Sequence, residues 1–124
     1  MTPAAGEALG AAEVIVGYQT YLDLIPEFLV DKEVLASQMM KEVDRCRKAL
    51  DLAAQGRIVA LVSGGDPGIY AMAGLVFEMA REQSVTVDIE VIAGIAALNA
   101  CAARLGAPLM HDFAAISLSD LLTP

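Results

Sequence analysis

The chain has few of the residues from which metal and redox sites are built. Its 124 residues include no tryptophan, one histidine, His111, and two cysteines, Cys46 and Cys101, which form no Cys-x-x-Cys motif. A histidine-rich metal site and a paired-cysteine zinc site are therefore excluded, and we expect no metal. Because both cysteines fall within helical patterns, we expect two reduced thiols in the core and no disulfide.

Basic residues are also scarce. Eight lysines and arginines stand against sixteen acidic residues, which gives a formal net charge of −8. This excess of negative charge argues against nucleic acid or an anionic membrane as a partner. The longest apolar runs, such as residues 58–62, are far shorter than the roughly 20 residues that span a bilayer. Since the first residues also lack the basic start of a secretory signal, we expect a soluble, cytoplasmic protein.

Apolar residues, in contrast, make up 56% of the chain, enough for the core of a single domain over residues 1–124. Short apolar runs predict strands at residues 13–17, 33–36, 58–62, 85–92 and 113–118. Helical spacing predicts helices at residues 3–12, 18–25, 41–55, 69–82 and 96–105. This alternation predicts an α/β fold with an open, mostly parallel sheet and helices on both faces.

The helix predicted at residues 41–55 has the clearest amphipathic pattern. Its expected core face consists of Val43, Cys46, Ala49, Leu50 and Ala53, which recur at helical spacing. Charged residues, Arg45 among them, surround the other face, which we interpret as solvated. Gly56 follows where a C-terminal cap belongs.

The most informative stretch is the glycine-rich turn at residues 63–70, Ser-Gly-Gly-Asp-Pro-Gly-Ile-Tyr, which directly follows the strand predicted at 58–62. Two interpretations are open: a ligand-binding loop, in which glycine permits close backbone approach, or a simple helix cap formed by Asp66 and Pro67. The stretch has neither the Gly-x-Gly-x-x-Gly spacing of dinucleotide folds nor the Lys-Ser/Thr ending of a P-loop. Phosphate binding is therefore disfavoured.

A second loop of small residues, 94–97, follows the strand predicted at 85–92. Ligands of open α/β sheets bind outside the carboxyl ends of the strands, and both loops lie at such ends. Two small-residue loops on one rim favour a ligand site over a helix cap.

Three blocks of the chain resemble the tetrapyrrole methylases, and within that family the enzymes that methylate C17 of precorrin-3B, with ring contraction, in corrin (cobalamin) biosynthesis. The blocks are residues 16–22, residues 63–70, and residues 104–113 with 116–124. The family has two α/β domains with S-adenosylmethionine held between them. The resemblance implies that residues 1–124 are the S-adenosylmethionine-binding N-terminal half of such a methyltransferase, without the second domain.

By this resemblance, both loops would bind the methyl donor, through Gly64, Gly65, Asp66, Ile69, Ala96 and Ala97. The second loop reads Ala-Gly-Ile-Ala-Ala where the family usually has Pro-Gly-Val-Thr-Ala, so a threonine hydroxyl is missing. Candidates for the tetrapyrrole side are Tyr18, Tyr21, His111, Asp112, Ser117 and Ser119. Tyr18 and Tyr21 would share one face of a helix, where they either border the substrate or pack with their hydroxyls at the surface. No catalytic acid or base is assigned.

An alternative function is also consistent with the sequence. Family members usually open with a strand and a loop rich in glycine and proline, which are missing before the first predicted helix. A precorrin carries many carboxylates, and a net charge of −8 would repel it unless basic residues came from elsewhere. The alternative is a non-catalytic truncated paralogue or fragment that acts as an oligomerising α/β module. Under either function we expect a homo-oligomer or association with the missing C-terminal domain.

Overall fold

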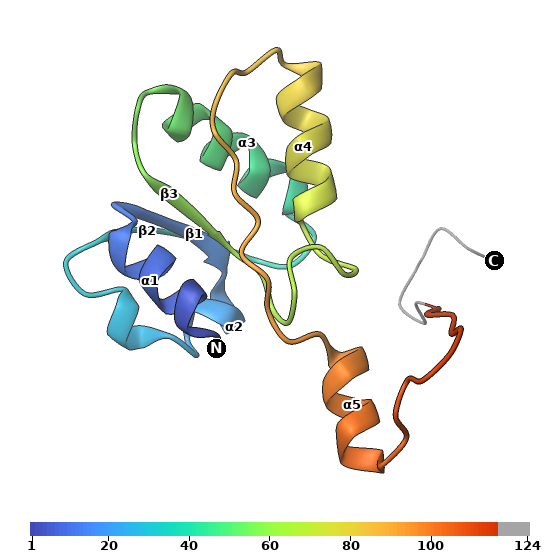
Figure 1. The fold of residues 1–124 in the computed structure, drawn as a ribbon. Helices are drawn as coiled ribbons and strands as arrows, with labels where there is room; N and C mark the ends of the chain where they lie inside the picture. Colours follow the sequence, from blue (N-terminus) through green and yellow to red (C-terminus); the bar gives the residue numbers. More distant parts are fainter. Residues whose placement is uncertain (117–124) are drawn as a thin grey trace.

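The computed structural model describes residues 1–116. Its elements, in chain order, are α1 Pro3–Ala11, β1 Val14–Tyr18, α2 Gln19–Leu22, the 3-10 turn η1 Pro26–Phe28, β2 Glu33–Ser37, α3 Glu42–Ala54, β3 Val59–Val62, α4 Ala73–Glu82 and α5 Ala97–Leu105. The three strands are parallel and lie in the order β2-β1-β3 (Figure 1). The predicted α/β fold with a parallel sheet is confirmed.

The central strand, β1, carries the most deeply buried side chains of the sheet. Val14 and Ile15 have no exposed surface, and Val16 is 1% exposed. Val16 pairs with Leu35 of β2 and with Leu61 of β3. A run of branched apolar residues is typical of a strand that is covered on both faces, and β1 is covered in this way.

Helices cover both faces of the sheet, as predicted. Because side chains alternate along a strand, Ile15 packs on one face with Leu9 and Ala12 of the α1 segment and with Leu22 of α2. Val14 and Val16 pack on the other face, against Ala49 of α3. A further layer forms where α3 meets α4, and its buried members are Cys46, Leu50, Met79 and Ala80.

The core face of α3 differs from the prediction at Val43 and Arg45, and Ala53, also expected in the core, is only half-buried. Val43, expected in the core, is 47% exposed, whereas Arg45, expected on the solvated face, is only 5% exposed. The buried stripe of α3 is Arg45, Cys46, Ala49 and Leu50. These spacings of one, three and four are helical, so the stripe is rotated toward Arg45 and away from Val43. The predicted cap is confirmed: Gly56 has a φ of +85° and its amide donates to the carbonyl of Ala53.

Two predicted helices are shorter than expected. α2 covers only Gln19–Leu22, so Tyr18 ends β1 and is not helical. α4 begins at Ala73 and not at residue 69. Tyr70 has a left-handed φ of +50°, a conformation that interrupts a right-handed helix. Consequently Asp66 does not cap α4, and the helix-cap interpretation of the glycine-rich turn is wrong.

The strand predicted at residues 85–92 is not part of the described sheet. Its side chains do alternate, and Val87 and Ile89 pack against the layer between α3 and α4. Within residues 1–116, however, no backbone amide of residues 86–92 donates to a backbone carbonyl. The alternation therefore comes from covering helices, not from pairing with β3. Residues 113–116 also form no strand, and the rest of the last predicted strand lies outside the described residues.

Neither cysteine is in a disulfide, as expected, but only one belongs to the core. Cys46 is fully buried, and this burial raises the pKa of its thiol to about 11. Cys101 on α5 is exposed, contrary to the prediction. Among the described residues, no helix is long and apolar enough to cross a membrane.

Candidate functional site

Two loops meet at the carboxyl end of the sheet. The first, residues 63–72, leads from β3 to α4, and the second, residues 93–96, leads into α5. They touch at Gly65 and Gly94: a Cβ atom at position 94 would overlap the carbonyl oxygen of Gly65 and lie 2.9 Å from its carbonyl carbon. Only glycine fits at position 94, because any side chain would displace the first loop.

Asp66 connects the two loops through its carboxylate. Oδ1 accepts a hydrogen bond of 2.8 Å from the amide of Gly68 within the first loop. Oδ2 accepts one of 2.9 Å from the amide of Gly94, 28 residues away in the second loop. Both oxygens thus accept from backbone amides, and the Gly94 bond is partly buried.

A cavity of about 410 Å³ lies between the loops, and we call it the loop cavity. It is lined by all six residues assigned to the methyl donor from the sequence, Gly64, Gly65, Asp66, Ile69, Ala96 and Ala97. Tyr70, Leu98, Ala115 and Ile116 complete the lining. The walls are therefore mostly small or apolar, and among the lining residues only Asp66 and Tyr70 have a polar side chain. Tyr70 directs its hydroxyl to the carbonyl of Ala115, at 2.7 Å.

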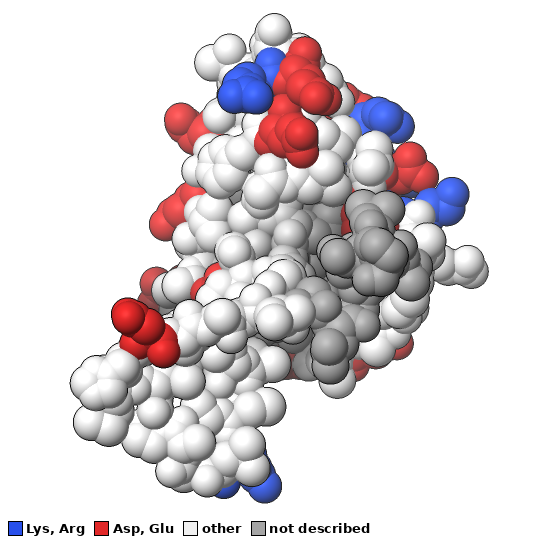
Figure 2. Space-filling view, turned by 90° about the vertical axis from the view of Figure 1, so that its right-hand side faces the viewer, with Lys and Arg blue, Asp and Glu red and all other residues white. Residues whose placement is uncertain are grey.

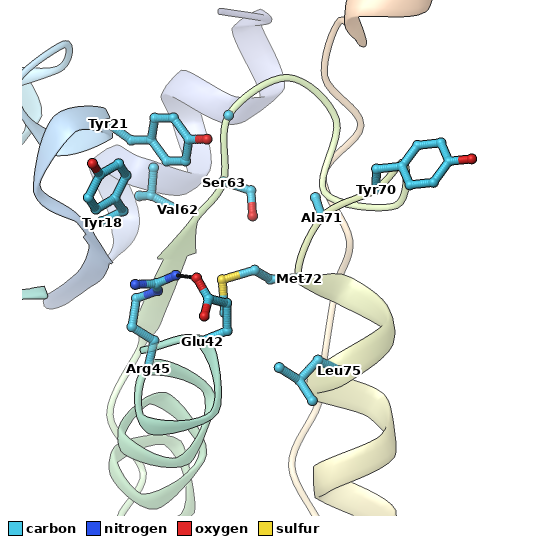
Figure 3. A pocket seen from close by; sticks show the side chains of 11 residues that line it. Tyr18, Tyr21, Glu42, Arg45, Val62, Ser63, Tyr70, Ala71, Met72 and Leu75 are labelled. Atoms are coloured by element: carbon cyan, nitrogen blue, oxygen red, sulfur yellow. Dashed lines mark hydrogen bonds and ion pairs between the residues drawn. The ribbon is translucent and has the colours of Figure 1, made fainter. Parts of the chain in front are cut away.

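A second cavity, of about 240 Å³, lies on the other side of the first loop, and we call it the tyrosine cavity. Tyr18 and Tyr21 form part of its wall, with ring centroids 5.3 Å apart in an edge-to-face arrangement (Figure 3). A Cβ atom at Gly64 would lie 2.9 Å from the ring of Tyr21, so this glycine allows the ring to approach the loop. Gly64 and Tyr70 line both cavities.

The tyrosine cavity also contains an ion pair that the sequence did not predict. Arg45 Nη2 lies 2.8 Å from Oε1 of Glu42, and Nη1 donates to Ser37 Oγ and to the carbonyl of Gln38, both at 2.9 Å. Arg45 and Glu42 are the only charged residues that line this cavity within the described part of the chain (Figure 3). The helical spacing of Arg45 from Ala49, a core residue, was the signal that could have revealed its burial.

The other predicted residues are not brought to the cavities. His111 and Asp112 are exposed and line neither cavity, so their assignment to the substrate side has no geometric support. Ser117 and Ser119 lie outside the described residues. Over residues 1–116, no group of three or more histidine, cysteine, aspartate or glutamate side chains could hold a metal ion.

Known proteins resemble this chain along its whole length. A probable cobalt-factor III C(17)-methyltransferase of Salmonella typhimurium is 54% identical over 124 residues, which are 100% of this chain and 52% of that protein. A precorrin-3B C(17)-methyltransferase of Sinorhizobium sp is 46% identical over 127 residues, 100% of this chain and 50% of that protein. The chain therefore spans about half the length of these relatives.

Solved structures agree with the sequence comparison. The crystal structure of the methyltransferase CobJ matches with a TM-score of 0.90 at 42% identity, over 100% of this chain and 52% of that one. A cobalt precorrin-4 methyltransferase, CbiF, matches with a TM-score of 0.71 at 26% identity, over 90% of this chain and 47% of that one. The model of the tetrapyrrole (corrin/porphyrin) methylases matches residues 1–124, and the chain belongs to this family.

Proposed function

We propose that this chain is the S-adenosylmethionine-binding half of a methyltransferase that acts on C17 of precorrin-3B, or of its cobalt-containing counterpart, in cobalamin biosynthesis. The relatives carry both substrate names, so the proposal covers both forms. The observation that carries it is the convergence of the two loops on one cavity, whose lining includes every residue that the family resemblance assigned to the donor.

The loop cavity suits the donor in size and chemistry. Its volume of about 410 Å³ lies within the roughly 300–1,000 Å³ of small-molecule sites. Apolar walls with backbone polar groups fit an adenosine group that is attached to a sulfonium centre. When bound, S-adenosylmethionine would supply an electrophilic methyl group, and transfer to a carbon nucleophile depends on alignment of the two. The contribution of this chain would be to position the donor.

The tyrosine cavity is our candidate for contact with the tetrapyrrole. It adjoins the loop cavity across Gly64 and Tyr70, which line both. At about 240 Å³ it is too small for a whole macrocycle. We infer that Tyr18 and Tyr21 contact one edge of the substrate, with the remaining contacts made by another segment or chain.

Calorimetric titration with S-adenosylhomocysteine tests donor binding on this chain directly. We expect saturable binding, which Ala97→Phe should weaken at least about tenfold because the ring would fill the loop cavity. The matched control is Ala100→Phe, at an exposed position on the same helix that does not line the cavity. Its affinity should stay within about twofold of the parent. Absence of binding at millimolar ligand would refute the proposal for this chain.

The second candidate is a non-catalytic α/β module. It is favoured by α5, which has no buried residue and so presents an unpacked surface. We infer that α5 contacts a second copy or a polypeptide that supplies the remaining half of the family fold. Donor binding separates the candidates, since only the methyltransferase needs it. The two free thiols are consistent with a reducing, cytoplasmic location, which we also propose.

A further inference from the structure

We propose that Asp66 is a positioning residue, which assembles the loop cavity by holding the second loop against the first. The family resemblance places Asp66 at the donor, where a free carboxylate could face the sulfonium. In the structure both carboxylate oxygens are already engaged by the amides of Gly68 and Gly94. The inference rests on the proposed function only for the identity of the ligand, because the hydrogen bond from Gly94 to Asp66 lies within the chain itself.

The second loop has few other hydrogen bonds to the rest of the chain, although Ala96 is buried. Within residues 1–116, two hydrogen bonds reach residues 93–96 from outside α5: the Asp66–Gly94 bond at 2.9 Å and an exposed bond of 3.3 Å from Thr2 Oγ1 to the carbonyl of Ala93. A hydrogen bond to a carboxylate is roughly twice as strong as one between neutral groups. The Asp66 bond is also the shorter and the more buried, so it is the stronger attachment.

Gly94 is held both by close packing against the first loop and by its hydrogen bond to the Asp66 carboxylate. The amide of Gly94 points to Asp66, while its Cα lies against the first loop so closely that a Cβ would overlap the Gly65 carbonyl oxygen. A Cβ there would also lie 3.3 Å from the Cα of Asp66. Gly94 can therefore reach the carboxylate only because it has no side chain, and the two features together determine the separation of the loops.

That separation determines the shape of the loop cavity. Gly64, Gly65 and Ile69 contribute the wall from the first loop. Ala96 of the second loop and Ala97, the first residue of α5, contribute the opposite wall. α5 itself has no buried residue, and Ala96 beside it is 5% exposed, so packing reaches this wall at Ala96 and not along the helix. Loss of the Asp66–Gly94 bond should therefore let the second wall move away and reduce ligand affinity, without direct loss of a ligand contact.

The test combines amide hydrogen exchange in the ligand-free chain with titration by S-adenosylhomocysteine. In Asp66→Ala we expect exchange at Gly94 to accelerate at least about tenfold and affinity to fall at least about tenfold, while the amide of buried Cys46 exchanges as in the parent. Asp66→Asn keeps one carbonyl acceptor and should give intermediate values for both. Asp51→Asn, an exposed carboxylate on α3, is the control and should change neither.

The possible results separate this inference from the proposed function. Affinity that falls in Asp66→Ala with unchanged exchange at Gly94 would overturn it, because Asp66 would then act on the ligand directly. Faster exchange at Gly94 with unchanged affinity would also overturn the inference, because the Asp66–Gly94 hydrogen bond would then not determine the shape of the cavity. If the parent chain binds no S-adenosylhomocysteine, the donor assignment fails, and exchange at Gly94 still decides whether Asp66 holds the loops together.

Discussion

Arg45 is a buried cation whose guanidinium connects the end of β2 to the first turn of α3. Its partners are Ser37, the carbonyl of Gln38, and Glu42. The Arg45 side chain is 6% exposed, whereas Glu42 is 45% exposed. A buried charge is tolerated when it is paired and hydrogen-bonded, and these partners satisfy both terminal nitrogens. Nε is buried without a partner among the described residues.

Removal of this side chain should destabilise the fold. For Arg45→Ala we expect a loss of about 1–3 kcal/mol in the free energy of unfolding, because the Ser37 hydroxyl and the Gln38 carbonyl lose their donor. Arg47→Ala is the matched control on the same helix: its ion pair with Asp44 is exposed and 3.5 Å long. It should cost about 0.5 kcal/mol or less. Urea denaturation measures both, and equal losses would contradict the structural role of Arg45.

At the level of secondary structure elements, a group of charged side chains joins the three strands at their amino ends. Glu13 Oε2 accepts a hydrogen bond of 2.9 Å from the amide of Ile58, before β3, and lies 3.4 Å from Arg57 Nε. Arg57 Nη1 also lies 3.2 Å from Glu33 of β2. The Ile58 amide, with a smaller effect of Arg57, lowers the pKa of Glu13 below its ordinary value of 4.5.

Because the pKa of Glu13 is lower in the folded state, the contribution of Glu13 to stability depends on pH. Ionised Glu13 stabilises the fold above its unfolded pKa, and the contribution is lost as pH falls through the lower folded pKa. The free energy of unfolding of the parent should therefore exceed that of Glu13→Gln most at neutral pH. This difference should become smaller as the pH falls below about 4.5. A difference that stays constant from neutral pH to pH 3 would show that the charge of Glu13 does not contribute.

The elements differ in how far local sequence could predict them. The strands β1, β2 and β3 follow from short apolar runs in the sequence. α5 ends at Leu105, as predicted, and the next residue, Gly106, has a left-handed φ of +62°. Residues 85–91 alternate between apolar and polar side chains, yet they have no strand partner among residues 1–116. A pattern of period two reports which side chains face the core, and it says nothing of where the backbone finds hydrogen bonds.

At the level of the whole molecule, α5 projects away from the sheet and its helices (Figure 1). Figure 2 shows a largely uncharged surface at the height of α5, below the charged side chains that gather higher on the molecule. Leu105, in the last turn of α5, is 79% exposed, and no residue of the helix is buried. Within residues 1–116, α5 is mostly exposed along its length, and an exposed apolar surface of this kind is typical of an interaction site.

We therefore expect this chain to self-associate through α5. Sedimentation velocity should show species larger than a monomer, and Leu105→Lys should weaken association at least about tenfold, because a charge would have to be buried in the contact. Val30→Lys is the matched control, since Val30 is 65% exposed at a position outside α5. A parent chain that stays monomeric over the accessible concentrations would contradict the prediction.

The sequence by itself determined the family, the parallel α/β architecture and the two glycine-containing loops, because these follow from motifs and local periodicity. Only the tertiary structure determined the hydrogen-bond partners of Asp66 and Arg45. Whether Asp66 caps a helix or ties two loops depends on Gly94, 28 residues away, and whether Arg45 is solvated depends on the end of β2. Such partners come together only through folding, so local patterns could locate the glycine-rich turn but could not assign the partners of its aspartate.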